Sequence, residues 1–244
     1  MADGIIAVVP ARGGSKGIPK KNLCLLGGIP LVAWSIRVGL GTKQIDRVIL
    51  STDDRQIAEI GKKEGSEVWL RPPELATDSA TTLSVLQNIL DRLAREGANC
   101  KLLVLLEPTS PFRPPGLVDR CITMSLGTQE VTVVTVTALE RNPFNIFSIE
   151  GNKAKPFVQE PQLRFSRRQD FSYLKRLNGS VYVLRPDNLR MGYLFRDAID
   201  VIEMSPEMSI NIDTPLDFQL AKLALEKFTE EDEMGFWILR DKNK

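Results

Sequence analysis

Short apolar segments rich in β-branched residues alternate along this chain with longer segments whose apolar residues recur at helical spacing. A short apolar run bounded by turn residues predicts a buried strand, and apolar positions at i, i+3 and i+4 predict an amphipathic helix. The pattern predicts strands at 5–9, 47–50, 67–70, 101–106, 131–137, 178–184 and 198–203. It predicts helices at 30–40, from a cap within 51–54 to about 64, at 82–95, at about 115–126 and at 214–228. This alternation predicts an α/β fold of Rossmann type, a mainly parallel sheet flanked by helices.

The segment 140–175 interrupts the alternation. It is rich in Pro, Asn, Phe, Arg and Lys and carries only short strand-like pieces, at 144–149 and 155–158. Because these pieces do not form a further strand–helix unit, we predict that the segment leaves the sheet. The predicted organisation is a first part of the core at 1–139, a small β-rich extension at 140–175 and a second part of the core at 176–244.

The first predicted strand leads into a glycine-rich basic loop, PARGGSKGIPKKN at 10–22. Its glycines allow a tight turn and let backbone N–H groups approach a ligand, while its cations supply positive charge. The cations are Arg12, Lys16, Lys20 and Lys21. The spacing is neither that of a Walker A motif nor that of GxGxxG. A loop of this composition directly after a buried strand favours a triphosphate site over a simple bend or a solvated lysine-rich loop.

Composition excludes some classes of binding and catalysis. The 244 residues carry a formal net charge of +1, which argues against a nucleic-acid-binding protein, because such proteins show a broad basic excess. The chain has no histidine, so an imidazole base and a histidine-ligated metal are both excluded. Acid–base chemistry must therefore use carboxylates, lysine or a metal-bound oxygen.

Cysteine spacing and hydropathy predict the cellular compartment of the protein. Cys24, Cys100 and Cys121 lie far apart without a CxxC pair, which favours reduced thiols, and we expect them in the core. The chain shows no pattern of a leader peptide and no apolar stretch of membrane-spanning length. We therefore expect a cytoplasmic protein without a membrane partner.

Seven blocks of the sequence, in order, resemble those of the N-acylneuraminate cytidylyltransferases, which join CMP to sialic acid and its relatives. They resemble more loosely the 3-deoxy-manno-octulosonate cytidylyltransferases. The first block is the basic loop, and the others are STDD at 51–54, LRPPELATD at 70–78, LLEPTSPFR at 105–113, RRQD at 167–170, RLNGSVYVLR at 176–185 and INIDTPLDFQLA at 210–221. The resemblance implies an enzyme that activates a nine-carbon 2-keto sugar acid, of sialic, legionaminic or pseudaminic type, with CTP.

The resemblance also implies roles for individual residues. CTP would be bound by Ala11, Arg12, Gly14, Lys16, Asn22, Arg71, Ala80 and Thr82. The acidic sugar would be held by Glu107, Arg168, Arg176, Asn178 and Tyr182. The catalytic residues would be Lys21, Arg168 and Asp213, and Mg²⁺ would be held by Asp213 and Asn211 together with the phosphates. The extension at 140–175 is implied to reach over a partner subunit in a homodimer.

Two positions depart from the pattern of that family. Glu107 stands where most of its sialic acid enzymes have Gln, and an ionised carboxylate only accepts hydrogen bonds whereas an amide also donates them. Asn211 stands where the family has the first of two metal-binding aspartates, which makes Asp217 a possible second carboxylate. Two alternatives stay open: an octulosonate enzyme, which RRQD and NGSVYV disfavour, and a non-catalytic nucleotide-binding homologue, which the two departures favour.

Overall fold

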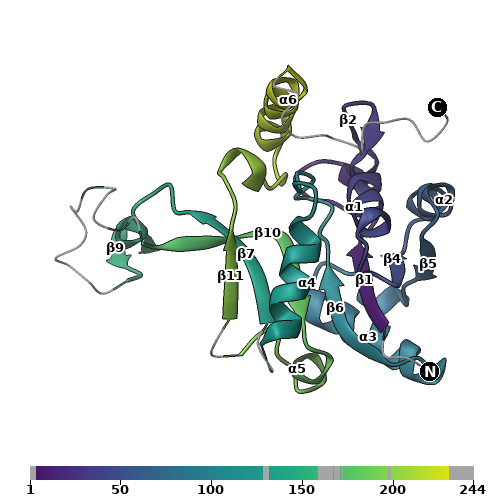
Figure 1. The fold of residues 1–244 in the computed structure, drawn as a ribbon. Helices are drawn as coiled ribbons and strands as arrows, with labels where there is room; N and C mark the ends of the chain where they lie inside the picture. The colour runs from purple at the N-terminus through teal and green to yellow at the C-terminus, as the bar shows by residue number, and fades with distance from the viewer. Residues whose placement is uncertain are drawn as a thin grey trace.

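The computed structural model describes residues 4–128, 132–158, 167, 171, 173–196 and 199–230. A seven-stranded sheet forms its centre, with the strand order β11-β7-β10-β6-β1-β4-β5 (Figure 1). The strands are β1 (Gly4–Pro10), β4 (Arg47–Thr52), β5 (Glu67–Leu70), β6 (Cys100–Leu105), β7 (Thr132–Ala138), β10 (Lys175–Leu184) and β11 (Ile199–Glu203). All neighbours in the sheet run parallel except β10, which is antiparallel to β6 and to β7.

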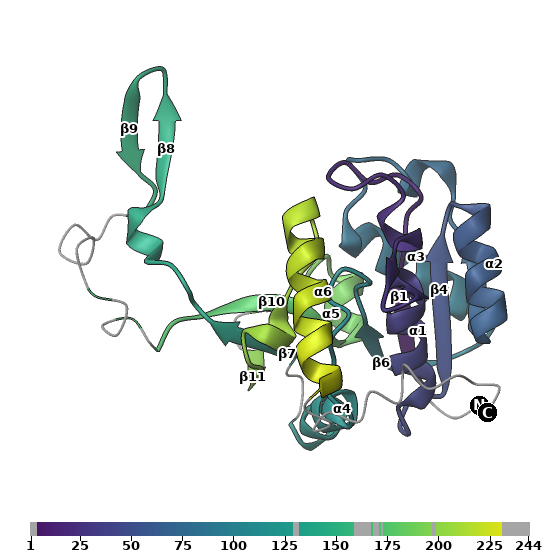
Figure 2. The same cartoon turned by 90° about the horizontal axis from the view of Figure 1, so that it is seen from above.

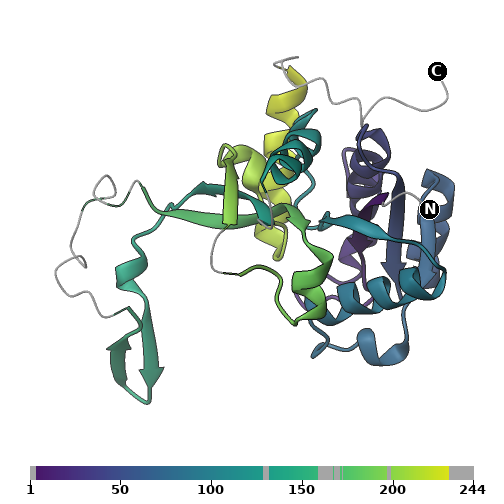
Figure 3. The same cartoon turned by 60° about the horizontal axis from the view of Figure 1, so that its bottom comes forward.

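Helices cover both faces of the sheet. They are α1 (Leu31–Gly41), α2 (Arg55–Glu64), α3 (Thr82–Arg95), α4 (Leu117–Gly127), α5 (Pro186–Arg190) and α6 (Pro215–Glu230). Side chains alternate across β1, because successive residues of a strand point to opposite faces. Ile5, Ala7 and Val9 join a core cluster with α1, α2, α4 and α6, whereas Ile6 and Val8 join a second cluster with α3 and α5. Figure 3 shows α3 and α5 on the same side of the sheet. The predicted fold class is confirmed.

The strand β10 corrects one prediction. We predicted that an Asn-Gly turn precedes a strand at 178–184, but the strand starts at Lys175 and contains Asn178 and Gly179 in its interior. Gly179 has φ +73°, a conformation that glycine adopts at little cost, and the pairing with β7 shifts register between Leu177 and Tyr182. The dipeptide therefore makes a bulge inside a long strand.

The segment 139–158, which follows β7, extends away from the body of the protein (Figure 2). A short 3₁₀ helix, η3 (Pro143–Asn145), leads into a separate two-stranded hairpin of β8 (Phe147–Glu150) and β9 (Lys153–Pro156). The first predicted strand piece, at 144–149, thus divides into a helical turn and a strand. A second hairpin, β2 (Leu25–Leu26) with β3 (Ile29–Pro30), was not predicted.

Two further short 3₁₀ helices, η1 (Lys21–Leu23) and η2 (Pro73–Leu75), lie near the sheet edge that carries the basic loop. Another, η6 (Glu207–Ser209), precedes residues 210–213, which we call the INID segment. In the part of the chain that the structure describes, no helix is long and apolar enough to cross a membrane. Cys121 is buried as expected, but Cys24 and Cys100 are only half-buried.

Candidate active site

The basic loop leaves the carboxyl end of β1, the edge at which ligands collect in parallel α/β sheets. Two contacts hold it in place. The backbone N–H of Gly13 donates to Asp53 Oδ1 at 2.9 Å, and Asn22 Nδ2 donates to the carbonyl of Arg12 at 2.9 Å. The helix cap predicted within 51–54 is Asp54, whose side chain accepts from the backbone of Gln56. Of the two adjacent aspartates, Asp54 therefore caps α2, and Asp53 supports the basic loop.

Two glycines of the loop are required by close packing. A Cβ atom on Gly13 would lie 2.8 Å from the side chain of Asp54. A Cβ atom on Gly17 would lie 2.0 Å from the carbonyl oxygen of Asp213, a distance that no side chain can accommodate. The loop after the first strand and the INID segment near the end of the described chain are thus in direct backbone contact.

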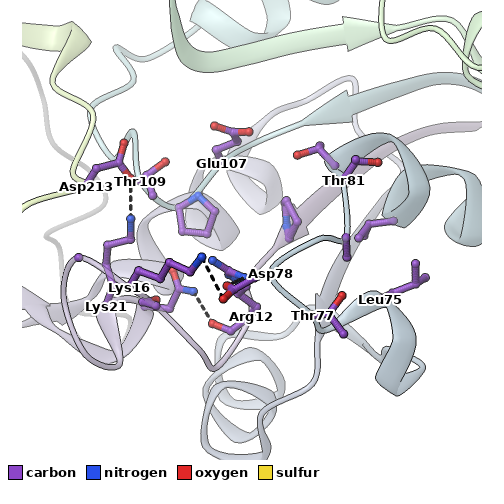
Figure 4. Close-up of a pocket in the computed structure, with 18 of the residues that line it drawn as sticks. Arg12, Lys16, Lys21, Leu75, Thr77, Asp78, Thr81, Glu107, Thr109 and Asp213 are labelled. Carbon is purple, nitrogen blue, oxygen red and sulfur yellow. Dashed lines mark hydrogen bonds and ion pairs between the residues drawn. The ribbon is translucent and has the colours of Figure 1, made fainter. Parts of the chain in front are cut away.

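A cavity of about 580 Å³ opens between the loop and the ends of the neighbouring strands (Figure 4). Several residues to which the family resemblance assigned a role line the cavity, namely Arg12, Lys16, Lys21, Asn22, Arg71, Ala80, Thr82, Glu107, Asn211 and Asp213. These residues come from segments that lie up to roughly two hundred residues apart in the sequence, and the sheet brings the segments to one edge. Their convergence creates a single polar cavity large enough for a nucleotide, within the usual range for ligand sites.

Three cations of the cavity are paired with carboxylates of the protein. Asp78 lies 2.7 Å from Arg12 Nη1 and 3.1 Å from Lys16 Nζ, and Asp213 lies 2.8 Å from Lys21 Nζ. Hydrogen bonds from Lys16 and then from Arg12 hold the pKa of Asp78 below its usual value. The pairs do not close the cavity, and all five side chains line it. A phosphate group that enters must therefore compete with internal acids.

Arg71 forms the wall of the cavity next to β4. Its guanidinium donates to the hydroxyl of Ser51 at 3.0 Å and to the carbonyl of Ser51 at 2.9 Å. Burial lowers the pKa of Arg71 to about 10, with Asp53 opposing and Arg12 reinforcing the shift. The side chain still carries a full positive charge at neutral pH, and its neutral partners leave that charge available to a ligand.

Glu107 forms the wall opposite the basic loop (Figure 4). Burial raises the pKa of its carboxyl group, and nearby Arg113 and Lys21 oppose the shift. Arg113 is fully buried and donates to three oxygens: the carbonyl of Ser180 at 2.8 Å, the hydroxyl of Ser35 at 3.0 Å and the carbonyl of Glu107 at 2.8 Å. Burial lowers the pKa of Arg113 to about 9, and Glu107 opposes this shift. Arg113 therefore ties the turn that carries Glu107 to α1 and β10.

The INID segment presents two oxygen-bearing side chains to the cavity. Asn211 Nδ2 donates to Asp213 Oδ2 at 2.7 Å, and Asn211 Oδ1 accepts from Ser110 at 3.3 Å. Asp217, the possible second metal carboxylate, caps α6 instead, because one of its oxygens accepts from the backbone of Asp213 and from both the backbone and the hydroxyl of Thr214. Burial raises the pKa of Asp217, but these hydrogen bonds and the charge of Lys21 together lower it by more, so the net shift is downward.

Other assigned residues lie outside the lining of the cavity. Ala11 is buried and Gly14 faces open space. Arg176 is half-exposed and 3.8 Å from Glu140. The amide of Asn178 is buried in a network with Thr135, Ser180, Ser209 and Met204. Burial raises the pKa of Tyr182 to about 12, with a further contribution from Glu107. Arg168 lies outside the described residues, so its predicted role stays a prediction.

Asp78 and Arg113 have no site role in the sequence analysis, and Asp53 could face the site on the sequence alone, although its place beside Asp54 favours a helix cap. Asp78 is the last residue of the LRPPELATD block. The partners of these two aspartates lie tens of residues away, from 40 for Asp53 to 66 for Asp78, so no local spacing reveals the contacts. For Arg113, the only available indication was a cation directly after a buried strand and a Pro-rich turn.

The comparisons with known proteins agree with this geometry. A sequence model described as cytidylyltransferase matches residues 6–238, so the chain belongs to the cytidylyltransferase family. A relative from Legionella pneumophila, CMP-N,N'-diacetyllegionaminic acid synthase, is 32% identical over 91% of this chain and 96% of its own length. The N-acylneuraminate cytidylyltransferases of Danio rerio (form A) and Escherichia coli are 30% and 29% identical over 92% and 89% of this chain, which spans only 51% of each of them. The predicted resemblance is confirmed.

Solved structures share the fold. CMP:2-keto-3-deoxy-manno-octonic acid synthetase complexed with CTP matches with a TM-score of 0.67 at 17% identity, covering 94% of this chain and 100% of that chain. The 2-C-methyl-D-erythritol 4-phosphate cytidylyltransferase of Thermus thermophilus matches with a TM-score of 0.60 at 16% identity, covering 91% and 99%. At such identities the likeness concerns the fold alone.

Proposed function

We propose that the chain activates a nine-carbon 2-keto sugar acid, of sialic, legionaminic or pseudaminic type, with CTP to give the CMP-sugar and pyrophosphate. One observation carries the proposal: Arg12, Lys16 and Lys21 line one side of a single cavity, and Glu107 lines the wall opposite them. These three cations form a cationic corner that suits a triphosphate, and the space between the corner and the opposite wall leaves room for a second substrate. Membership in the cytidylyltransferase family and the names of the relatives support this reading.

The reaction needs positioning and charge neutralisation more than covalent chemistry. The anomeric hydroxyl oxygen of the sugar forms a bond to the α-phosphorus of CTP, and the bond to the bridging oxygen of pyrophosphate breaks. The hydroxyl proton passes to Glu107, the carboxylate on the cavity wall opposite the basic loop. Arg12, Lys16 and Lys21 neutralise the charge that develops on the phosphate oxygens.

The residues of the INID segment fit Mg²⁺ that is bound partly by phosphates. Asp213 offers a carboxylate and Asn211 an amide oxygen at the cavity, and Mg²⁺ takes oxygen ligands from one or two protein groups together with phosphates and water. Among the described residues, no group of three or more acidic or thiol side chains is arranged to hold a metal alone. Mg²⁺, when bound, supplies neutralisation of negative charge on the phosphate oxygens. We therefore propose that its affinity depends on bound CTP.

A pyrophosphate-release assay tests the proposed function. The chain is mixed with CTP and Mg²⁺ and with one sugar acid at a time, chosen from N-acetylneuraminic, legionaminic, pseudaminic and 3-deoxy-manno-octulosonic acids, and a mixture without sugar acid is the control. Release with a nine-carbon acid supports the proposal. Release with the octulosonic acid alone would favour the octulosonate enzyme, and CTP binding without any release would favour a non-catalytic homologue.

We also propose a homodimer formed through the extension at 140–175. Ile149 of β8 is 66% exposed and Phe157, directly after β9, is 74% exposed on a hairpin that projects from the body (Figure 2). Exposed apolar groups gathered on a projecting element are typical of protein contacts. A cytoplasmic setting is proposed as well, because the enzyme uses CTP and its three cysteines carry no disulfide.

A further inference from the structure

The carboxylate of Asp78 lies between two cations that the proposed function assigns to the triphosphate. Its Oδ1 accepts from Arg12 Nη1 at 2.7 Å, and its Oδ2 lies 3.1 Å from Lys16 Nζ (Figure 4). Each oxygen thus meets one cation, in the way that two oxygens of a phosphate group would. The carboxylate therefore imitates an anionic ligand in the cationic corner.

The segment that carries Asp78 is anchored at its ends and exposed in its middle. It lies between η2 and α3, and Thr81 caps the start of that helix, because its hydroxyl accepts from the backbone of Ser84 at 3.1 Å. Residues Thr77, Asp78 and Ser79 are exposed. Exposed loop residues have few contacts to lose, so the carboxylate can leave the cations without disturbing the core.

Lys16 depends on this contact for its position. Its side chain is 76% exposed, and among the described residues Asp78 is the acidic side chain that lies within ion-pair distance of it. Lys21 differs, because its side chain is only 12% exposed and also donates to the carbonyl of Ile212. In the cationic corner, Lys21 is therefore a fixed cation, whereas Lys16 is held over the cavity by Asp78.

We propose that Asp78 is an internal counter-anion that the phosphates of CTP displace, and that it thereby sets the affinity of the corner for triphosphate and pyrophosphate. The inference rests on the proposed function. Carboxylate and phosphate oxygens carry the same sign of charge and compete for the same N–H donors of Arg12 and Lys16. When pyrophosphate leaves, Asp78 returns to both cations and stabilises the empty corner, which favours product release.

Calorimetry with two probes, inorganic pyrophosphate and CTP, tests the inference in EDTA and without sugar acid. Exposed ion pairs contribute little each, so Asp78→Asn should lower the dissociation constant of either probe about two- to tenfold. The variant should also show a steeper loss of affinity with salt, because a larger net positive charge meets the anion. Asp78→Glu, which keeps the charge, should bind nearly as the native chain does.

A matched control is Asp187→Asn in α5, which removes an exposed carboxylate paired with Arg190 at 2.9 Å away from the cavity lining. Equal affinity of Asp78→Asn and the native chain would overturn the inference, and so would weaker binding, which would mean that Asp78 orders the cations for the ligand. The measurement needs no turnover. Failure to form any CMP-sugar would overturn the proposed function and leave this test valid.

Discussion

At the scale of single residues, Lys21 joins the two halves of the site. Its Nζ donates to the carbonyl of Ile212 and to Asp213 Oδ1, both at 2.8 Å, and these residues belong to the same segment as Asn211. A cation fixed at two points needs no reorganisation when charge develops nearby, which is the condition for strong electrostatic catalysis. Lys21 is therefore the loop cation from which we expect the largest effect on rate.

We predict that Lys21→Ala lowers kcat/KM about a hundredfold, a loss of about 3 kcal/mol of transition-state stabilisation, the scale of losing one preorganised donor. Steady-state kinetics of pyrophosphate release measure the effect. Lys20→Ala is the matched control, since Lys20 Nζ donates to Gln56 Oε1 at 3.0 Å and does not line the cavity. Full turnover by Lys21→Ala would refute the catalytic role.

A second residue-scale prediction concerns Asn211. Replacing it with Asp places two carboxylates side by side at the cavity, because Asn211 Nδ2 now lies 2.7 Å from Asp213 Oδ2. Mg²⁺ binds carboxylates more strongly than amides, so Asn211→Asp should lower the Mg²⁺ concentration needed for half-maximal rate and preserve activity.

A Mg²⁺ titration of the initial rate measures this shift. Asn152→Asp, in the exposed turn of the β8–β9 hairpin, adds the same charge elsewhere and serves as the control. A large loss of activity at saturating Mg²⁺ would show that Asn211 is retained for a role other than metal binding.

At the scale of elements, the basic loop and the INID segment meet without room for a methyl group. The contact of Gly17 with the carbonyl of Asp213 is between two backbones, so neither side can yield by turning a side chain. It sets the distance between Lys21 and Asp213 through the chain itself. The position of the phosphate-binding cations is therefore coupled to that of the proposed metal ligand.

Gly17→Ala should push these two segments apart and lower kcat/KM at least tenfold, since displacements of about 1 Å at a site have effects of this order or larger. Thermal unfolding, followed in parallel, separates the local change from loss of the fold. The control is Gly127→Ala in α4, where an added Cβ meets no atom within 4 Å. An active Gly17→Ala protein with native Mg²⁺ dependence would contradict the coupling.

At the scale of the whole molecule, the projecting hairpin predicts the oligomeric state. Ile149→Asp places a charge on its apolar surface and should convert the proposed dimer to a monomer, which light scattering after size-exclusion chromatography measures. Because Ile149 is 66% exposed, the change should leave each subunit folded. Ser148→Asp, at the neighbouring exposed position of β8, is the control, and an unchanged mass of Ile149→Asp would contradict a dimer formed through this surface.

Much of the fold was predictable because the central strands are buried and parallel. The central strands predicted at 5–9 and 101–106 are observed at Gly4–Pro10 and Cys100–Leu105, and the edge strand at 67–70 and the helix at 82–95 match their observed bounds. The antiparallel orientation of β10 was not predicted, because the spacing of apolar residues does not depend on the direction in which a strand runs. At the site, side chains that directly follow strands were found, whereas Asp78 and Arg113 act through contacts that only the folded chain creates.

The strand order has a consequence for how the protein is made. β10 lies between β6 and β7, although β7 precedes it in the chain. Until the residues after 139 have emerged from the ribosome, β6 is an open sheet edge and β7 lacks both strands, β10 and β11, with which it pairs. An open apolar edge invites pairing with other chains. We therefore expect the nascent protein to be prone to aggregation until β10 inserts between β6 and β7.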